Sequence, residues 1–102
     1  MLPLVFHPLV EADLATSAEW YGRQQPGLDK RFLSEAHECF ADLPANTPLY
    51  AIRFADIRRM NMPVFKHGSF YFITDEAVVV LAILHGHRDS NAELQRRRRK
   101  YG

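Results

Sequence analysis

The sequence has one cysteine, Cys39, among its 102 residues, so no disulfide can form within the chain. It also has no apolar run that approaches the ~20 residues a helix needs to cross a bilayer. Residues 1–6 show neither the basic start nor the long hydrophobic stretch of a secretory signal. These absences predict a protein that does not engage the membrane, and a cytoplasmic location fits a lone thiol best.

Internal repeats are absent, and no segment is of low complexity apart from the arginine-rich end of the chain. The composition is that of a globular protein with a real core, because 47% of the residues are hydrophobic and 25% are charged. A length of 102 residues suits one domain, residues 1–102, which ends in a basic tail, residues 91–102.

Charge is divided unevenly along the chain. Residues 1–50 contain three Lys/Arg and seven Asp/Glu, a net charge of −4, whereas residues 51–102 contain ten and five, a net charge of +5. A molecule of this kind can present its basic part to an anionic partner. The alternative is that the tail is only a solvated charge run on a neutral domain.

The first half of the sequence predicts a strand and two helices. Residues 4–6 form a short apolar run that Pro8 stops. Residues 10–21 then follow helical spacing, with Pro8 in the first turn, and residues 24–27 break that helix. A second apolar face runs from Leu28 to Leu43, after which Pro44 is expected to end the helix. Two helices with so short a break indicate an αα-hairpin.

The second half predicts strands. Residues 57–64 alternate, with Arg58 and Arg59 on opposite faces, and Lys66-His67-Gly68 is a plausible hairpin turn. Residues 70–73 form the next strand. Residues 77–84 are almost wholly apolar, which is typical of a central strand covered on both faces. We therefore predict an α+β fold of order β-α-α-β-β-β, with the αα-hairpin packed on a mostly antiparallel sheet and a short C-terminal helix from Asn91 as a further option.

Candidate functional residues follow the apolar run. Arg88 lies just past a rigid strand, and its guanidinium suits two parallel hydrogen bonds to a phosphate. A salt bridge to one of the neighbouring carboxylates, Asp89, Asp75 or Glu76, is the structural alternative. His85 shares a face with His87 and Asp89, but nothing in the sequence completes a metal site, so we predict no metal. His85 is either an acid–base group or a strand-end histidine bonded to backbone.

Three stretches resemble the ParE/RelE superfamily of toxins from bacterial type II toxin–antitoxin modules. "HPLVEADLATSAEWY" resembles the first helix of that family. "IRRMNMPVF" followed by "FYFI" resembles its central hairpin, and "VVVLAILHGHRDS" resembles its last strand with a His-x-x-Arg-Asp-Pro ending. The sequence differs at Phe65-Lys66-His67, where the family has Phe-Pro-Tyr, and at Ser90, which replaces the proline.

The resemblance implies two functions that differ in chemistry. A ParE-like toxin poisons DNA gyrase, is not an enzyme and uses no cofactor. A RelE-like toxin is an endoribonuclease that cuts mRNA on the ribosome. For the nuclease, the candidate catalytic residues are Arg88, His85, Arg59, Lys66 and His67. The basic residue expected where residues 68–71 begin is missing or displaced to Lys66 or His67, and this incomplete set favours the ParE-like reading.

Both functions imply a cognate antitoxin, assembly with it, and a target that is either gyrase or the ribosome with its mRNA. The residues expected to bind the target or a phosphate are Arg88, Arg58, Arg59, Arg96, Arg97, Arg98, Arg99 and Lys100. A weaker alternative is a nucleic-acid-binding regulator that uses residues 96–100 against phosphates. We further expect the strand to hold Arg88 rigidly, while the tail charges sit on flexible stems and add only long-range attraction.

Overall fold

A computed structural model describes residues 2–46, 50–85 and 90–102. The elements are β1 (Leu4–Phe6), α1 (Val10–Gln24), α2 (Leu28–Asn46), β2 (Ile52–Phe54), β3 (Ile57–Asn61), β4 (His67–Ile73), β5 (Val78–His85), α3 (Asn91–Arg98) and a 3-10 turn (Arg99–Tyr101). The strands form one sheet in the order β1-β5-β4-β3-β2. β1 pairs with β5 in parallel and every other pair is antiparallel.

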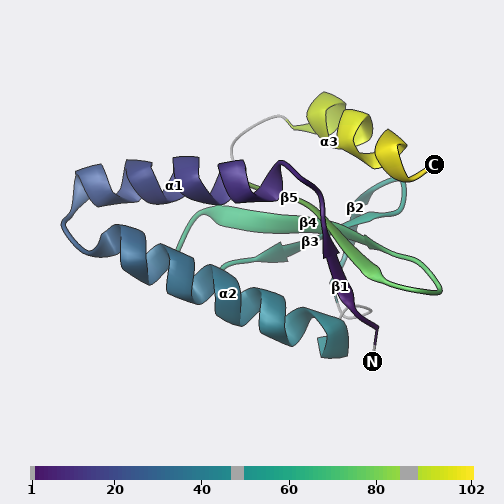
Figure 1. The fold of residues 1–102 in the computed structure, drawn as a ribbon, viewed down its shortest axis with the longest axis horizontal. Helices are drawn as coiled ribbons and strands as arrows, with labels where there is room; N and C mark the ends of the chain where they lie inside the picture. The colour runs from purple at the N-terminus through teal and green to yellow at the C-terminus, as the bar shows by residue number, and fades with distance from the viewer. Residues whose placement is uncertain (1, 47–49, 86–89) are drawn as a thin grey trace.

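The helices cover both faces of this sheet. α1 and α2 form an antiparallel pair, and α3 lies apart from them near the C-terminus (Figure 1). The apolar face of the pair packs with one set of sheet residues into a core cluster that includes Phe32, Tyr71 and Val80. On the other face, Leu94 of α3 is 1% exposed and packs with residues such as Phe72 and Leu81.

β5 is an interior strand, between β1 and β4, and a β-bulge changes its alternation. Tyr71 of β4 pairs with Val80, but its neighbour Phe70 pairs with Ala82, so Leu81 is the extra residue. As a result Leu81 and Ala82 both join the core cluster on the α3 side, and Ile83 returns to the side of the helix pair. The bulge therefore decides which residues of β5 face α1.

The predicted fold class is confirmed, including the αα-hairpin, the interior position of residues 77–84 and the short C-terminal helix. The predicted separation of Arg58 and Arg59 onto opposite faces also agrees with the packing. No helix in the described ranges has the length and apolarity that a bilayer crossing requires.

Three local predictions were wrong. Sequence patterning missed β2, a three-residue edge strand that pairs with β3. It placed a turn at residues 66–68, but His67 and Gly68 already belong to β4. It also ended the second helix at Pro44, whereas α2 includes that residue in its last turn. A proline there removes one hydrogen bond at the end of the helix, which a last turn tolerates better than a helix interior does.

Candidate functional site: a groove beside α1 and two arginine environments

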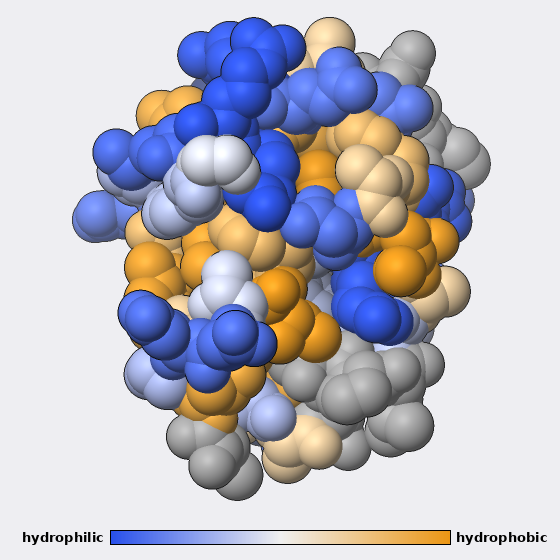
Figure 2. Space-filling view, turned by 90° about the vertical axis from the view of Figure 1, so that its right-hand side faces the viewer, coloured by the Kyte–Doolittle hydropathy of each residue, from blue (hydrophilic) through white to orange (hydrophobic). Residues whose placement is uncertain are grey.

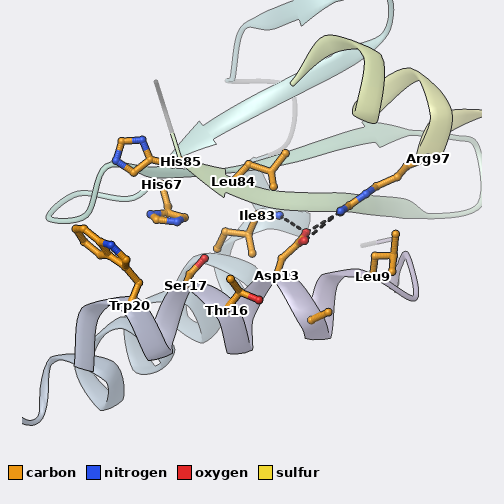
Figure 3. A pocket seen from close by; sticks show the side chains of 11 residues that line it. Leu9, Asp13, Thr16, Ser17, Trp20, His67, Ile83, Leu84, His85 and Arg97 are labelled. Carbon is orange, nitrogen blue, oxygen red and sulfur yellow. Dashed lines mark hydrogen bonds and ion pairs between the residues drawn. The ribbon is translucent and has the colours of Figure 1, made fainter. Parts of the chain in front are cut away.

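A hollow of about 440 Å³ lies between α1 and the C-terminal half of β5 (Figure 3). β1 ends at Phe6, opposite Val80, and the chain then turns into α1. The edge of β5 beyond Val80 is therefore bordered by a helix and not by a strand. Most of the surface that lines the hollow is apolar, although six of its eleven residues are polar or charged: Leu9, Ala12, Asp13, Thr16, Ser17, Trp20, His67, Ile83, Leu84, His85 and Arg97.

One end of the hollow is closed by an ion pair between Asp13 of α1 and Arg97 of α3. Arg97 Nη1 lies 2.6 Å from Asp13 Oδ2, and Nη2 lies 3.1 Å from Oδ1. The same carboxylate accepts the backbone N–H of Ile83, while Arg97 donates to the carbonyl of Leu81 and, through Nε, to Glu93. These bonds give partners to the N–H of Ile83 and the carbonyl of Leu81 around the bulge, and they connect α1, β5 and α3.

The electrostatics of this pair favour the charged state of Arg97. Burial alone lowers the pKa of Arg97, but its hydrogen bonds to Asp13 and Glu93 outweigh that effect and raise the pKa overall. The Arg97 side chain is 6% exposed. The expectation that Arg97 sits on a flexible stem and binds phosphate is therefore wrong, because its donors are already occupied by carboxylates of the same chain.

The other cations of the predicted tail occupy different environments. Arg96 forms an exposed ion pair with Glu93. Arg98 lies 2.9 Å from Asp56 and stacks on Phe72, with Cζ 3.8 Å from the ring centroid. Arg99 and Lys100 are exposed. Figure 2 views the side with the C-terminus, and hydrophilic residues gather at its top, where Figure 1 places α3.

His67, His85 and Trp20 form the other end of the hollow. The Nδ1 atom of His67 is hydrogen-bonded to the Tyr21 hydroxyl at 3.0 Å. Burial lowers the pKa of His67 to about 4, and the nearby His85 and Arg59 act in the same direction. His67 is therefore neutral at pH 7. The His85 ring lies 5.3 Å from it, centroid to centroid, because the two residues are paired across β4 and β5.

Trp20 stands at this end of α1 and is 51% exposed, so it does not seal the core. A second hollow of about 380 Å³ shares Trp20 and His85 with the first and continues to Val64 and Lys66. Val64 is 57% exposed and Lys66 is exposed in the turn before β4. The two hollows together form an apolar groove beside α1, which we call the α1 groove.

The two arginines of β3 have different surroundings. Arg58 faces the helix pair, and its Nη1 donates to the carbonyl of Tyr50 at 2.7 Å, so it holds the chain that enters β2. Arg59 faces the other side, where its Cζ lies 5.3 Å from the centroid of Phe70. Its Nε atom is buried and has no hydrogen-bond partner in the part of the chain that the structure describes.

The structure brings His67 and His85 together, with Lys66 beside the same groove, but it places Arg59 on the opposite face of the sheet. The space that a side chain at Gly68 would fill is occupied by Arg59, so the preceding residue, His67, points to the opposite face of the sheet. Arg88 lies outside the described residues, as do His87 and Asp89. Within the described ranges, no three His, Cys, Asp or Glu side chains gather as a metal site would need.

The sequence reasoning missed two features of this region. Asp13 lies in the first turn of α1, and the partner that gives it a role is Arg97, 84 residues away. Gly68 was assigned to a turn, and its role is to leave room for Arg59. Neither feature has a local sequence signal, because each depends on which side chain a distant element places nearby.

The sequence profile of one family, described as "ParE toxin of type II toxin-antitoxin system, parDE", matches residues 4–90. The chain belongs to this ParE toxin family. The match runs from β1 to the residue before α3, and so includes the whole sheet and every residue that lines the α1 groove except Arg97. No curated protein matches the sequence in the comparison with characterised proteins.

Among solved structures, the chain is similar to a chain of the chromosomal ParDE toxin–antitoxin system from P. aeruginosa. The TM-score is 0.69 at 14% sequence identity, and the alignment covers 83% of this chain and 96% of the other. At that identity the likeness concerns the fold, and it agrees with the ParE assignment that the sequence profile makes independently.

Proposed function

We propose that this ParE-family toxin arrests bacterial growth by poisoning DNA gyrase and that a cognate antitoxin neutralises it. The observation that carries the proposal is the separation of Arg59 and His67, which lie on opposite faces of the sheet. A nuclease must place its acid, its base and its phosphate-binding group within reach of one scissile phosphate. Arg59 lies on the other face of the sheet from His67 and His85, and this separation supports a toxin that acts by binding.

The chemistry of the individual residues supports the same choice. The pKa of about 4 makes His67 a weak base, and its Nδ1 is already bonded to Tyr21. Arg58 donates to a backbone carbonyl, and Lys66 lies at the mouth of the α1 groove. A toxin that acts by binding needs no such set of reactive groups. It needs a rigid surface with large apolar anchors, and the exposed Trp20 beside the α1 groove is a residue of that kind.

Growth and purified components test the proposal together. Expression of the chain alone in a bacterium should arrest growth, and co-expression of the antitoxin encoded beside it should relieve the arrest. With purified gyrase, the toxin should inhibit supercoiling of plasmid DNA and leave cleaved DNA complexes. The antitoxin added in equal amount should abolish both effects, and a heat-unfolded sample of the toxin serves as the control.

A RelE-like ribonuclease is the competing function, and Arg59 is the residue that favours it. Sequencing of mRNA ends soon after induction separates the two functions. Codon-dependent cuts in ribosome-bound mRNA within minutes, with normal plasmid supercoiling, would overturn the gyrase proposal. Unimpaired growth at high soluble expression would contradict both functions.

A further inference from the structure

Arg59 is held in an unusual position across the neighbouring strand. A Cβ atom added at Gly68 would lie 2.2 Å from Arg59 Nε and 2.9 Å from Cζ. The guanidinium therefore lies against the backbone of β4, in space that any other residue at position 68 would occupy. Phe70 supports it further along the same strand, 5.3 Å from Cζ. Glycine and phenylalanine together fix the orientation of this side chain.

The guanidinium so held has no anionic partner in the described chain. Its Nε is buried without a hydrogen bond, whereas Arg97 and Arg98 both contact carboxylates. Burial lowers the pKa of Arg59, and the nearby cation of Arg53 lowers it further. A partly desolvated cation beside a second cation is unfavourable unless an anion compensates it. The structure thus holds the Arg59 guanidinium in a partly desolvated position, with no ion pair to a carboxylate in the described residues.

The same face of the sheet carries further positive charge. Arg98 stacks on Phe72, two residues along β4 from Phe70, so the two guanidinium groups lie over rings on one face. Arg53 is close enough to Arg59 for its charge to act on it, and Arg98 is paired with Asp56. A row of cations favours a ligand with several linked negative charges over a single acidic side chain.

We propose that the surface around Arg59, on the α3 side of β3 and β4, binds the phosphate backbone of nucleic acid, with Arg59 donating paired hydrogen bonds to one phosphate. A guanidinium matches the geometry of phosphate oxygens, and its packing on Gly68 means that little side-chain freedom is lost on binding. Contacts of this type position a protein on nucleic acid without reading its sequence. The site is separate from the α1 groove and does not depend on the choice of gyrase as the target.

Salt dependence of binding is the sharpest test, because each phosphate contact contributes a known slope. Binding of a fluorescent 20-nucleotide DNA, single-stranded or duplex, should be measured by anisotropy over a range of NaCl concentrations. Arg59→Gln should weaken binding about tenfold at low salt. It should also reduce the slope of log K against log salt by about 0.9 for duplex or about 0.7 for single-stranded DNA. The strand type that binds more tightly identifies the source of the phosphate.

Two further variants and a control make the result specific. Arg59→Lys should keep most of the slope and lose affinity, because a lysine keeps the charge but not the paired hydrogen bonds. Gly68→Ala should weaken binding although no charge changes, because it displaces the guanidinium. Arg31→Gln removes an exposed arginine from α2 and should leave the slope unchanged. Circular dichroism and thermal unfolding of each variant report whether the fold is kept.

The opposite results would overturn the inference. If folded Arg59→Gln and Arg31→Gln change the slope equally, Arg59 makes no phosphate contact. If Arg59→Gln does not fold, a folded Arg59→Lys with unchanged affinity has the same meaning. If polyglutamate competes as strongly as DNA of equal charge, the ligand is an acidic protein segment. Failure here leaves the gyrase proposal untouched, since that proposal is tested by supercoiling and growth.

Discussion

At the scale of single residues, burial has turned several candidate functional groups into structural ones. His67 is the clearest case, because its ring is enclosed beside Tyr21 and its pKa is lowered to about 4. In the unfolded chain the His67 ring takes up a proton near its ordinary pKa of 6.5, whereas in the folded protein it does so only near pH 4. Stability is therefore full above pH 6.5 and falls as the pH drops from 6.5 towards 4.

We predict a loss on the order of 2 kcal/mol from this residue across that range, after allowance for partial solvation of the ring. Urea unfolding at several pH values between 4 and 7.5 measures it. His67→Gln should be less stable at pH 7.5 but should have a flatter pH dependence. Burial also lowers the pKa of His7, which makes stability fall with pH in the same direction. The effect of His67 is therefore the difference between the pH dependence of the wild type and that of His67→Gln.

His37→Gln, on the exposed surface of α2, is the control and should keep the wild-type pH dependence. An equal flattening in that variant would contradict the assignment of the effect to His67.

At the scale of elements, the Asp13–Arg97 pair decides how α3 joins the rest of the molecule. α3 packs only a small apolar surface, with Leu94 as its buried anchor, and its other buried side chain is Arg97. A buried carboxylate left without its partner is costly. The C-terminal residues that resemble a solvated tail in the sequence are therefore part of the packed structure.

We predict that Arg97→Ala lowers the free energy of unfolding by about 3–5 kcal/mol, because Asp13 and the backbone of β5 lose their partner. Denaturant unfolding followed by circular dichroism gives the value. The triple variant with Ser in place of Arg96, Arg99 and Lys100 is the matched control, and it should cost less than about 1 kcal/mol because those cations are exposed. In a double-mutant cycle, Asp13→Asn should add little once Arg97 is gone. Full additivity of the two changes would show that the pair is not coupled.

At the scale of the whole molecule, charge separates between the two sides of the fold. The helix pair and β1 come from the acidic half of the sequence, and the other strands and α3 come from the basic half. Because the helix pair lies on one face of the sheet and α3 on the other, the helix pair carries a net negative charge while the α3 side of β3 and β4 carries arginines. An anionic target and an apolar partner can thus meet the toxin on different surfaces.

Growth arrest in the cell tests which of the basic residues are needed for toxicity. We predict that Arg88→Ala abolishes or greatly weakens toxicity while leaving the fold and antitoxin binding intact, since a guanidinium after a buried strand is well placed to engage an anion. The triple variant at Arg96, Arg99 and Lys100 should remain toxic, because charges on exposed stems are strongly screened at physiological salt. The measurement is growth inhibition at matched soluble expression. A toxic Arg88→Ala combined with a harmless triple variant would reverse the roles of the strand end and α3.

The sequence by itself determined the helices, the interior strand β5 and the family, because these depend on local periodicity and on a contiguous motif. The apolar spacing of α1 and α2 and the run in β5 are repeated over many residues, so one unusual position does not hide them. A three-residue edge strand such as β2 has too little pattern to be seen in this way.

Only the tertiary structure decided which charges are available for function. Arg58, Arg59, Arg97 and Arg98 look alike in the sequence, yet one donates to a carbonyl, two contact carboxylates and one lies unpaired across Gly68. The partner of Arg97 is 84 residues away, and the space for Arg59 depends on a glycine in the adjacent strand. The physical reason is that the burial and pairing of a charge depend on the elements that fold against it. The residues next to it in the sequence do not reveal which elements those are.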